Sequence, residues 1–118
     1  MESDANIRDL AATFLRSAGH SVAFADHGAA ALVSIEQDRP DVVITEILFK
    51  QLDGLSLCRR IRGNPTEPTI RVIEMSILAA TERSQEAGAD LFLKKPLTQH
   101  RLVDAVRGVL ANPQGGIL

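Results

Sequence analysis

Three polar side chains that could do chemistry stand where short, apolar, β-branched segments end: Glu46, Ser76 and Lys95. The carboxylate of Glu46 offers the oxygen ligands that Mg²⁺ prefers, and an ammonium group such as that of Lys95 can neutralise it in an ion pair. The single cysteine, Cys58, excludes an internal disulfide and a multi-cysteine zinc site. We expect Cys58 to be a buried, inert side chain on the apolar side of a helix. The histidines are scattered, so we expect no histidine metal site.

Segments of two kinds alternate along the chain. Apolar, β-branched runs typical of strands occupy residues 21–25, 41–45, 70–75 and 91–93. Helical periodicity of apolar residues covers 7–15, 29–35, 55–61, 81–87 and 102–110. This alternation predicts right-handed crossovers and a parallel sheet that is covered by helices on both faces. In such a sheet function resides in the loops after the strands, which are residues 26–27, 45–54, 76–81 and 94–96.

Composition and charge exclude several classes of function. The chain has 118 residues, a net charge of -2 and a hydrophobic fraction of 45%, which fit one domain with its own core. The near-neutral charge argues against a protein that binds nucleic acid by neutralising phosphates. An aromatic content of 3%, without Trp or Tyr, provides no stacking platform for single strands. No apolar run has the length of a membrane span, and no secretory signal opens the sequence. We therefore expect a cytoplasmic protein with no membrane and no direct nucleic-acid partner.

Three ordered blocks of sequence resemble the receiver domains of bacterial response regulators, the phosphorelay proteins of two-component signalling. The first block, residues 40–46, PDVVITE, continuing to residues 52–62, LDGLSLCRRIR, resembles the third strand and third helix of that family. Residues 87–97, AGADLFLKKPL, resemble its fifth strand with a Lys-Pro ending, and residues 2–8, ESDANIR, resemble its first acidic loop. The resemblance covers essentially the whole chain. It implies an α/β, flavodoxin-like (CheY-like) fold, doubly wound around a parallel sheet of strand order 2-1-3-4-5.

The resemblance also implies a chemistry and assigns residues to it. In this family a histidine kinase phosphohistidine donates a phosphoryl group to an Asp at the end of the third strand, beside a Mg²⁺ ion. The acceptor position falls on Glu46, and Lys95, joined to Pro96 by an expected cis bond, takes the place of the lysine that contacts the phosphoryl group. Ser76 and Phe92 take the places of the switch hydroxyl and switch aromatic. The positions equivalent to the metal site are Glu2, Ser3, Glu46 and Leu48.

The chain departs from the family pattern at the acceptor position, so we expect an atypical receiver, or pseudo-receiver. Glu46 has one methylene more than Asp, which moves its oxygen roughly 1.5 Å toward Lys95 and Ser76, and misplacement on this scale costs on the order of 100-fold in rate. Ser3 replaces a carboxylate, and Lys50 adds positive charge, so that any Mg²⁺ is bound weakly. We therefore expect weak or absent phosphorylation, with a Glu46–Lys95 ion pair that partly mimics the phosphorylated arrangement.

Three other interpretations stay open. The chain could be a phosphorylation-competent receiver that a histidine kinase switches, or a receiver with a decayed site that carries no signal. A flavodoxin-like enzyme or cofactor-binding domain belongs to another class, and the lack of a phosphate loop, Trp and Tyr disfavours it, so we expect no enzyme. Three arginines of the third helix, Arg59, Arg60 and Arg62, are expected on a solvated face.

The distribution of residues within the chain predicts its organisation. We expect a receiver-like domain over residues 1–111 and a linker or tail over 112–118. Because only Met1 precedes the acidic loop, the first strand of the family is largely missing from the numbered sequence, and either upstream residues or another chain fill its place. The stretch from Ser76 to Ala87 is about three residues short, so the fourth helix should lose nearly a turn. Signalling is expected through the fourth helix, fifth strand and fifth helix, toward a histidine kinase or other signalling protein, with a homodimer and a C-terminal output domain as further expected partners.

Overall fold

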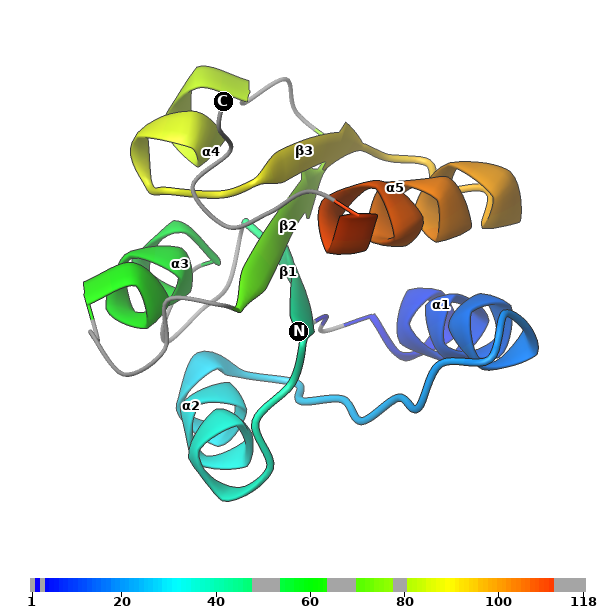
Figure 1. Cartoon of the computed structure of the whole chain (residues 1–118), viewed down its shortest axis with the longest axis horizontal. Coiled ribbons are helices and arrows are strands. Elements are labelled where there is room, and N and C mark those ends of the chain that lie inside the picture. Colours follow the sequence, from blue (N-terminus) through cyan, green and yellow to red (C-terminus); the bar gives the residue numbers. More distant parts are fainter. Residues whose placement is uncertain (1, 3, 48–53, 64–69, 78–80, 112–118) are drawn as a thin grey trace.

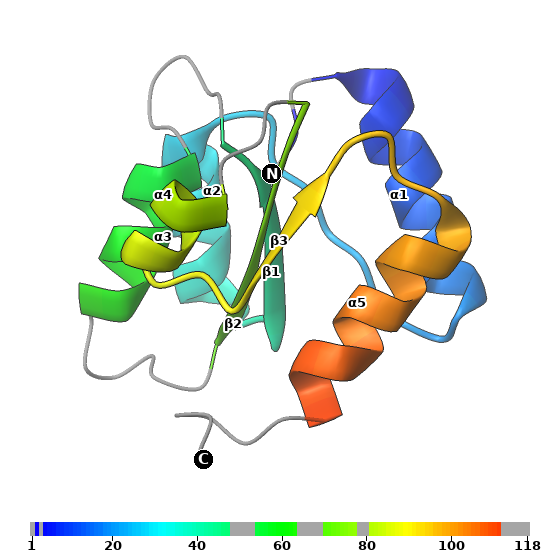
Figure 2. The same ribbon diagram turned by 90° about the horizontal axis from the view of Figure 1, so that it is seen from above.

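The computed structural model describes residues 2, 4–47, 54–63, 70–77 and 81–111. Its centre is a parallel sheet of three strands, β1 (Val42–Glu46), β2 (Arg71–Ser76) and β3 (Leu91–Lys94), which are hydrogen-bonded in that order (Figure 1). One face carries the helices α2 (Gly28–Gln37), α3 (Gly54–Gly63) and α4 (Thr81–Glu86), and the other carries α1 (Ala5–Ser17) and α5 (Gln99–Ala111) (Figure 2). The predicted α/β class, with a parallel sheet between two helical layers, is confirmed.

The first helix shows how local sequence sets the element boundaries. Asp4 is the N-cap of α1, and its carboxylate accepts hydrogen bonds from the backbone N–H groups of Asn6 at 2.9 Å and Ile7 at 3.3 Å. These bonds satisfy donors that have no partner within the helix. After the last turn Gly19 has a φ of 94°, which side chains other than glycine rarely adopt. The cap and this glycine together fix where α1 begins and ends.

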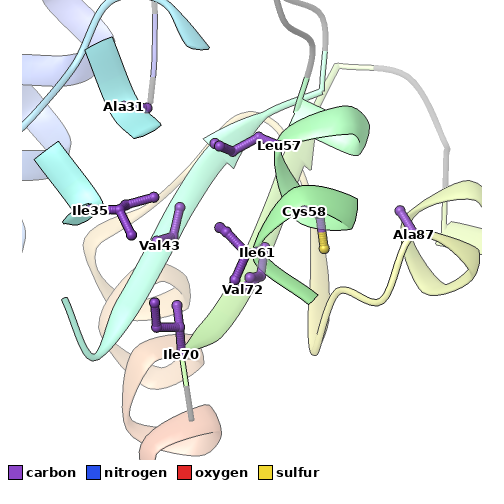
Figure 3. Close-up of a cluster of buried hydrophobic side chains, with 9 residues drawn as sticks. All are labelled: Ala31, Ile35, Val43, Leu57, Cys58, Ile61, Ile70, Val72 and Ala87. Carbon is purple, nitrogen blue, oxygen red and sulfur yellow. The ribbon is translucent and has the colours of Figure 1, made fainter. Parts of the chain in front are cut away.

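Alternate residues of the strands point to opposite faces of the sheet and build two hydrophobic cores. Val43 and Val72 belong to the core under α2 and α3, which Figure 3 shows. Ile73 and Met75 belong to the core under α1 and α5. Ile73 is fully buried, and full burial of such a side chain contributes about 1.5–3 kcal/mol. Cys58 is fully buried in the first core, as predicted.

The register of the strands brings their carboxyl ends to one edge of the sheet. Glu46 is paired with Met75, and Ser76 is paired with Lys94. The ladder continues one residue past each strand, since the Lys95 N–H donates to the Ser76 carbonyl at 2.8 Å. The peptide bond that follows, Lys95–Pro96, is cis as expected. Glu46, Ser76 and Lys95 therefore stand on neighbouring strands at the same edge.

The segment of residues 21–25 is not a strand, which corrects the prediction made from its apolar character. It has no regular secondary structure, and the backbone hydrogen bond seen here joins the Glu2 N–H to the Ala25 carbonyl at 3.3 Å. An extended segment becomes a strand only when a neighbour supplies a ladder of hydrogen bonds. In the order 2-1-3-4-5 that neighbour is the first strand, and the described residues contain no strand before α1.

Arg62, the last arginine of α3, is partly buried and not on a solvated face, which corrects a second expectation. Arg62 donates from Nε to the Gly88 carbonyl at 2.9 Å and from Nη2 to the Asp90 carboxylate at 2.5 Å, and a further bond reaches the Ile70 carbonyl. Asp90 also accepts from the Val72 N–H at 2.7 Å. We call this set of contacts the Arg62 clamp. It fastens the end of α3 to the turn before β3.

Candidate functional site

Two carboxylates and one ammonium group form a buried cluster at the carboxyl edge of the sheet. Lys95 Nζ donates to Glu2 Oε1 at 2.5 Å and is in direct ion-pair contact with Glu46 Oε2. The side chains of Glu2, Glu46 and Lys95 are 6%, 8% and 10% exposed, so the cluster is largely withdrawn from water. The sequence placed these three residues in one site, and the structure brings them together.

Each member of the cluster is held by a different part of the fold. Glu46 is the last residue of β1, and Lys95 follows β3 with its backbone bonded to the end of β2. Glu2 precedes α1, where its Oε2 accepts from the Asp4 N–H at 3.2 Å and its carbonyl accepts from Arg8 at 3.3 Å. The cluster thus joins the N-terminal segment to both outer strands of the three-stranded sheet.

The electrostatics of the cluster favour a charged lysine. Burial alone would lower the pKa of Lys95, but hydrogen bonds and charge attraction from Glu2 and Glu46 outweigh burial and raise that pKa above its ordinary value. With both carboxylates ionised, the three groups carry a net charge of about -1. The Coulomb attraction within such a pair is larger in a buried setting than at the surface, because water screens it less.

Of the two residues that the resemblance assigns to the switch, Ser76 lies beside the cluster, and Phe92 lies within β3, three residues before Lys95. Ser76 is 1% exposed and ends β2, and its carbonyl accepts the Lys95 N–H. Phe92 is half-buried in β3, two positions before Lys94, which is paired with Ser76. The backbone therefore links Ser76 to Lys95. Phe92 lies two residues farther along β3 from the carboxyl edge of the sheet than Lys94 does. Ser3, Leu48 and Lys50 lie outside the described residues.

A third acidic residue near the site was missed in the sequence. Glu74 in β2 is fully buried, between Thr45 and Phe92 in the sheet register. A Cβ atom placed on Gly54, the first residue of α3, would lie 2.6 Å from Glu74 Oε2. The signal that could have found Glu74 is a carboxylate within an otherwise apolar central strand, because buried charges need compensation. After burial, Glu74 is the next largest cause that raises the pKa of Cys58 to about 12, so this thiol is inert near neutral pH.

The donor atoms at this edge do not fit a magnesium ion well. Mg²⁺ requires about six oxygen ligands in near-octahedral geometry, usually with carboxylates that offset its charge. Glu2 and Glu46 are the carboxylates of the cluster, and each has one oxygen on Lys95. Among the described residues no group of three His, Cys, Asp or Glu side chains could hold a metal ion. A cation bound by the two oxygens that contact Lys95 would have to take the place of its ammonium group.

Comparison with known proteins gives the family. The model of the response regulator receiver domain matches residues 1–107. The chain is 36% identical over 110 residues to the transcriptional regulatory protein CseB of Streptomyces coelicolor, covering 93% of this chain and 47% of that protein. It is 31% identical over 111 residues to the response regulator MprA of Mycobacterium tuberculosis, covering 93% of this chain and 48% of that one. The chain therefore spans about half the length of these relatives.

Solved structures agree with the sequence comparison. The receiver domain of NtrX from Brucella abortus superposes with a TM-score of 0.83 at 30% identity, covering 92% of this chain and 93% of that domain. CseB is a transcriptional regulatory protein, and MprA is a response regulator. No helix in the described part of the chain is both long and apolar enough to cross a membrane. The sequence match, the parallel sheet and the acid–lysine cluster at its carboxyl edge lead to one conclusion: the chain belongs to the family of response regulator receiver domains.

Proposed function

We propose that this chain is an atypical receiver domain of a two-component response regulator, with weak or absent phosphorylation, that signals through the face formed by α4, β3 and α5. The observation that supports this most directly is the contact between Lys95 and Glu46. Glu46 stands at the position of the phosphoacceptor, and its carboxylate already engages the lysine that would contact an incoming phosphoryl group. The cluster therefore carries a built-in negative charge where a phosphorylated receiver acquires one.

The geometry explains why phosphoryl transfer should be slow. In-line attack needs an acceptor oxygen that is free and correctly placed. The side chain of Glu46 is 8% exposed, and its Oε2 contacts the Lys95 ammonium. The extra methylene of Glu46, relative to Asp, carries the carboxylate toward Lys95. Attack through Oε2 would first require this ion pair to open.

The rest of the proposal concerns partners. We infer that a histidine kinase or another signalling protein contacts the domain, and that the α4–β3–α5 face serves a homodimer or an output domain in the whole protein. The length of the relatives supports an output domain, since the chain matches 47% of one and 48% of another. The exposed side chains of α4 and α5 are polar and charged in the main, which suits a reversible contact.

The test is phosphorylation by a small donor. The chain is incubated with acetyl phosphate and Mg²⁺, and its intact mass is measured. We expect no phosphate adduct, or a small fraction of one. A stoichiometric adduct would overturn the proposal in favour of a phosphorylation-competent receiver.

A double variant tests the cause of the low reactivity. Glu46→Asp with Ser3→Asp restores the residue types that the family uses at the acceptor and metal positions. We expect this variant to gain Mg²⁺-dependent phosphorylation in the same mass assay. Glu46→Gln with Ser3→Asp is the matched control, because it restores the metal position without an acceptor. If neither variant reacts, the altered acceptor and metal positions are not what limits phosphorylation.

A further inference from the structure

The ammonium group of Lys95 occupies a position that a divalent cation would need in order to bind Glu2 and Glu46. An ammonium group has three N–H donors, and Lys95 directs bonds from one nitrogen to carboxylates on both sides of it. Its backbone is held at the sheet edge by the 2.8 Å bond to Ser76. The charged end of Lys95 therefore lies between Glu2 and Glu46, where it contacts the oxygens that a divalent cation would need.

We propose that Lys95 is the resident cation of this domain and that it excludes divalent cations from Glu2 and Glu46. The inference rests on the proposed function and deepens it, because a site that holds its own cation does not depend on Mg²⁺ to reach its resting arrangement. The domain is then insensitive to millimolar Mg²⁺ in the absence of a phosphoryl donor.

Charge and donor count support this exclusion. Adding Mg²⁺ beside Lys95 would place about three positive charges against the two negative charges of Glu2 and Glu46, at distances where like charges repel strongly. At the position where the family supplies a further carboxylate, this sequence has Ser3, which brings no charge. A cation that displaced Lys95 would also leave a largely buried ammonium group without its acceptors.

The experiment compares cation binding in four proteins without any phosphoryl donor. The wild-type chain and Lys95→Met, Lys95→Arg and Lys94→Met are titrated with Mg²⁺ and Mn²⁺, and thermal unfolding is recorded against an ionic-strength control. Lys95→Met keeps the length of the side chain and removes its charge, whereas Lys95→Arg keeps a cation. Lys94 is the matched control, since it is the exposed neighbouring lysine.

We expect Lys95→Met alone to gain divalent-cation affinity, by about tenfold or more, which is the effect of removing a competing interaction of about 1.4 kcal/mol. Its unfolding temperature should rise with added Mg²⁺, while those of the other three proteins stay constant. A triple variant, Lys95→Met with Glu2→Gln and Glu46→Gln, should lose the gain. An unchanged affinity in Lys95→Met overturns the inference, as does a Mg²⁺ affinity of the wild-type chain that equals that of the variant.

A second measurement uses only the native chain and does not depend on how the variants fold. Mn²⁺ broadens the amide resonances of residues near its binding site. We expect the Glu46 and Lys95 amides to stay sharp at submillimolar Mn²⁺, and selective broadening of both would overturn the inference. Neither cation experiment includes a phosphoryl donor. Cation binding in these experiments would therefore overturn this inference alone, whereas a phosphate adduct in the acetyl phosphate assay would overturn the proposed function.

Discussion

Removing the cation of the cluster should destabilise the domain far more than removing either anion. Lys95 Nζ contacts Glu2 at 2.5 Å and also contacts Glu46, so the two contacting oxygens lie no more than about 5 Å apart. In Lys95→Met both carboxylates lose their partner and face each other in a largely buried site. Leaving buried charges unpaired in this way costs about 3–5 kcal/mol of unfolding free energy.

Glu46→Gln should have a much smaller effect because two contributions oppose each other. The variant loses one charge-assisted contact, worth about 1.5–3 kcal/mol. It also relieves the repulsion between the two carboxylates, about 3 kcal/mol at 5 Å for an effective dielectric constant of about 20. The expected net change lies between zero and about 1.5 kcal/mol of added stability. The same reasoning applies to Glu2→Gln.

The assay is urea unfolding followed by far-ultraviolet circular dichroism in the presence of a chelator, because the chain has no Trp to report by fluorescence. Lys94→Met is the control, with an expected change within about 0.5 kcal/mol since its side chain is exposed. If Lys95→Met and Glu46→Gln cost the same, the electrostatic account of the cluster is refuted.

Three further predictions follow from contacts described above. Arg62→Ala should lower the unfolding free energy by about 2–4 kcal/mol, since it removes several partly buried bonds, whereas Arg59→Ala on the exposed side of α3 should change it by less than about 0.5 kcal/mol; urea unfolding measures both. Gly54→Ala should destabilise the domain by about 2 kcal/mol or more, because the added Cβ would overlap the Glu46 carbonyl. The pKa of Lys95 is raised above 10.5, so its ionic contribution to stability is complete below pH 10.5 and is lost as pH rises through the higher folded-state pKa. Thermal unfolding recorded from pH 9 upward should therefore show a decline above pH 10.5 that Lys95→Met lacks.

Much of the site could be predicted from the sequence because parallel strands end at a common edge. Once β1 and β3 were identified from their apolar runs, Glu46 and Lys95 had to lie near each other. The short fourth helix was also correctly predicted, and α4 has 6 residues. These features depend on the spacing of residues along the chain, and this spacing can be read from the sequence.

The features that the sequence did not reveal depend on partners far away in the chain. Residues 21–25 have the composition of a strand, but a strand exists only through its neighbour. Arg62 lies among arginines that periodicity assigns to an exposed face, yet its long side chain reaches carbonyls of two other segments. Glu74 follows apolar residues in β2, and its burial becomes evident only when helices cover both faces of the sheet.

The Arg62 clamp has a consequence for how a disturbance can travel through the domain. α4 is a single short helix with one buried side chain, Ser84, and so brief a helix gains little cooperativity of its own. Directly after it, Ala87 is buried and the Gly88 carbonyl is tied to α3 through Arg62. Unfolding of α4 should therefore stop at Ala87 and Gly88, and β3 should keep its register with β2. Amide protons of α4 should exchange quickly with solvent while those of β3 stay protected, so the proposed signalling face combines a readily reshaped half with a rigid one.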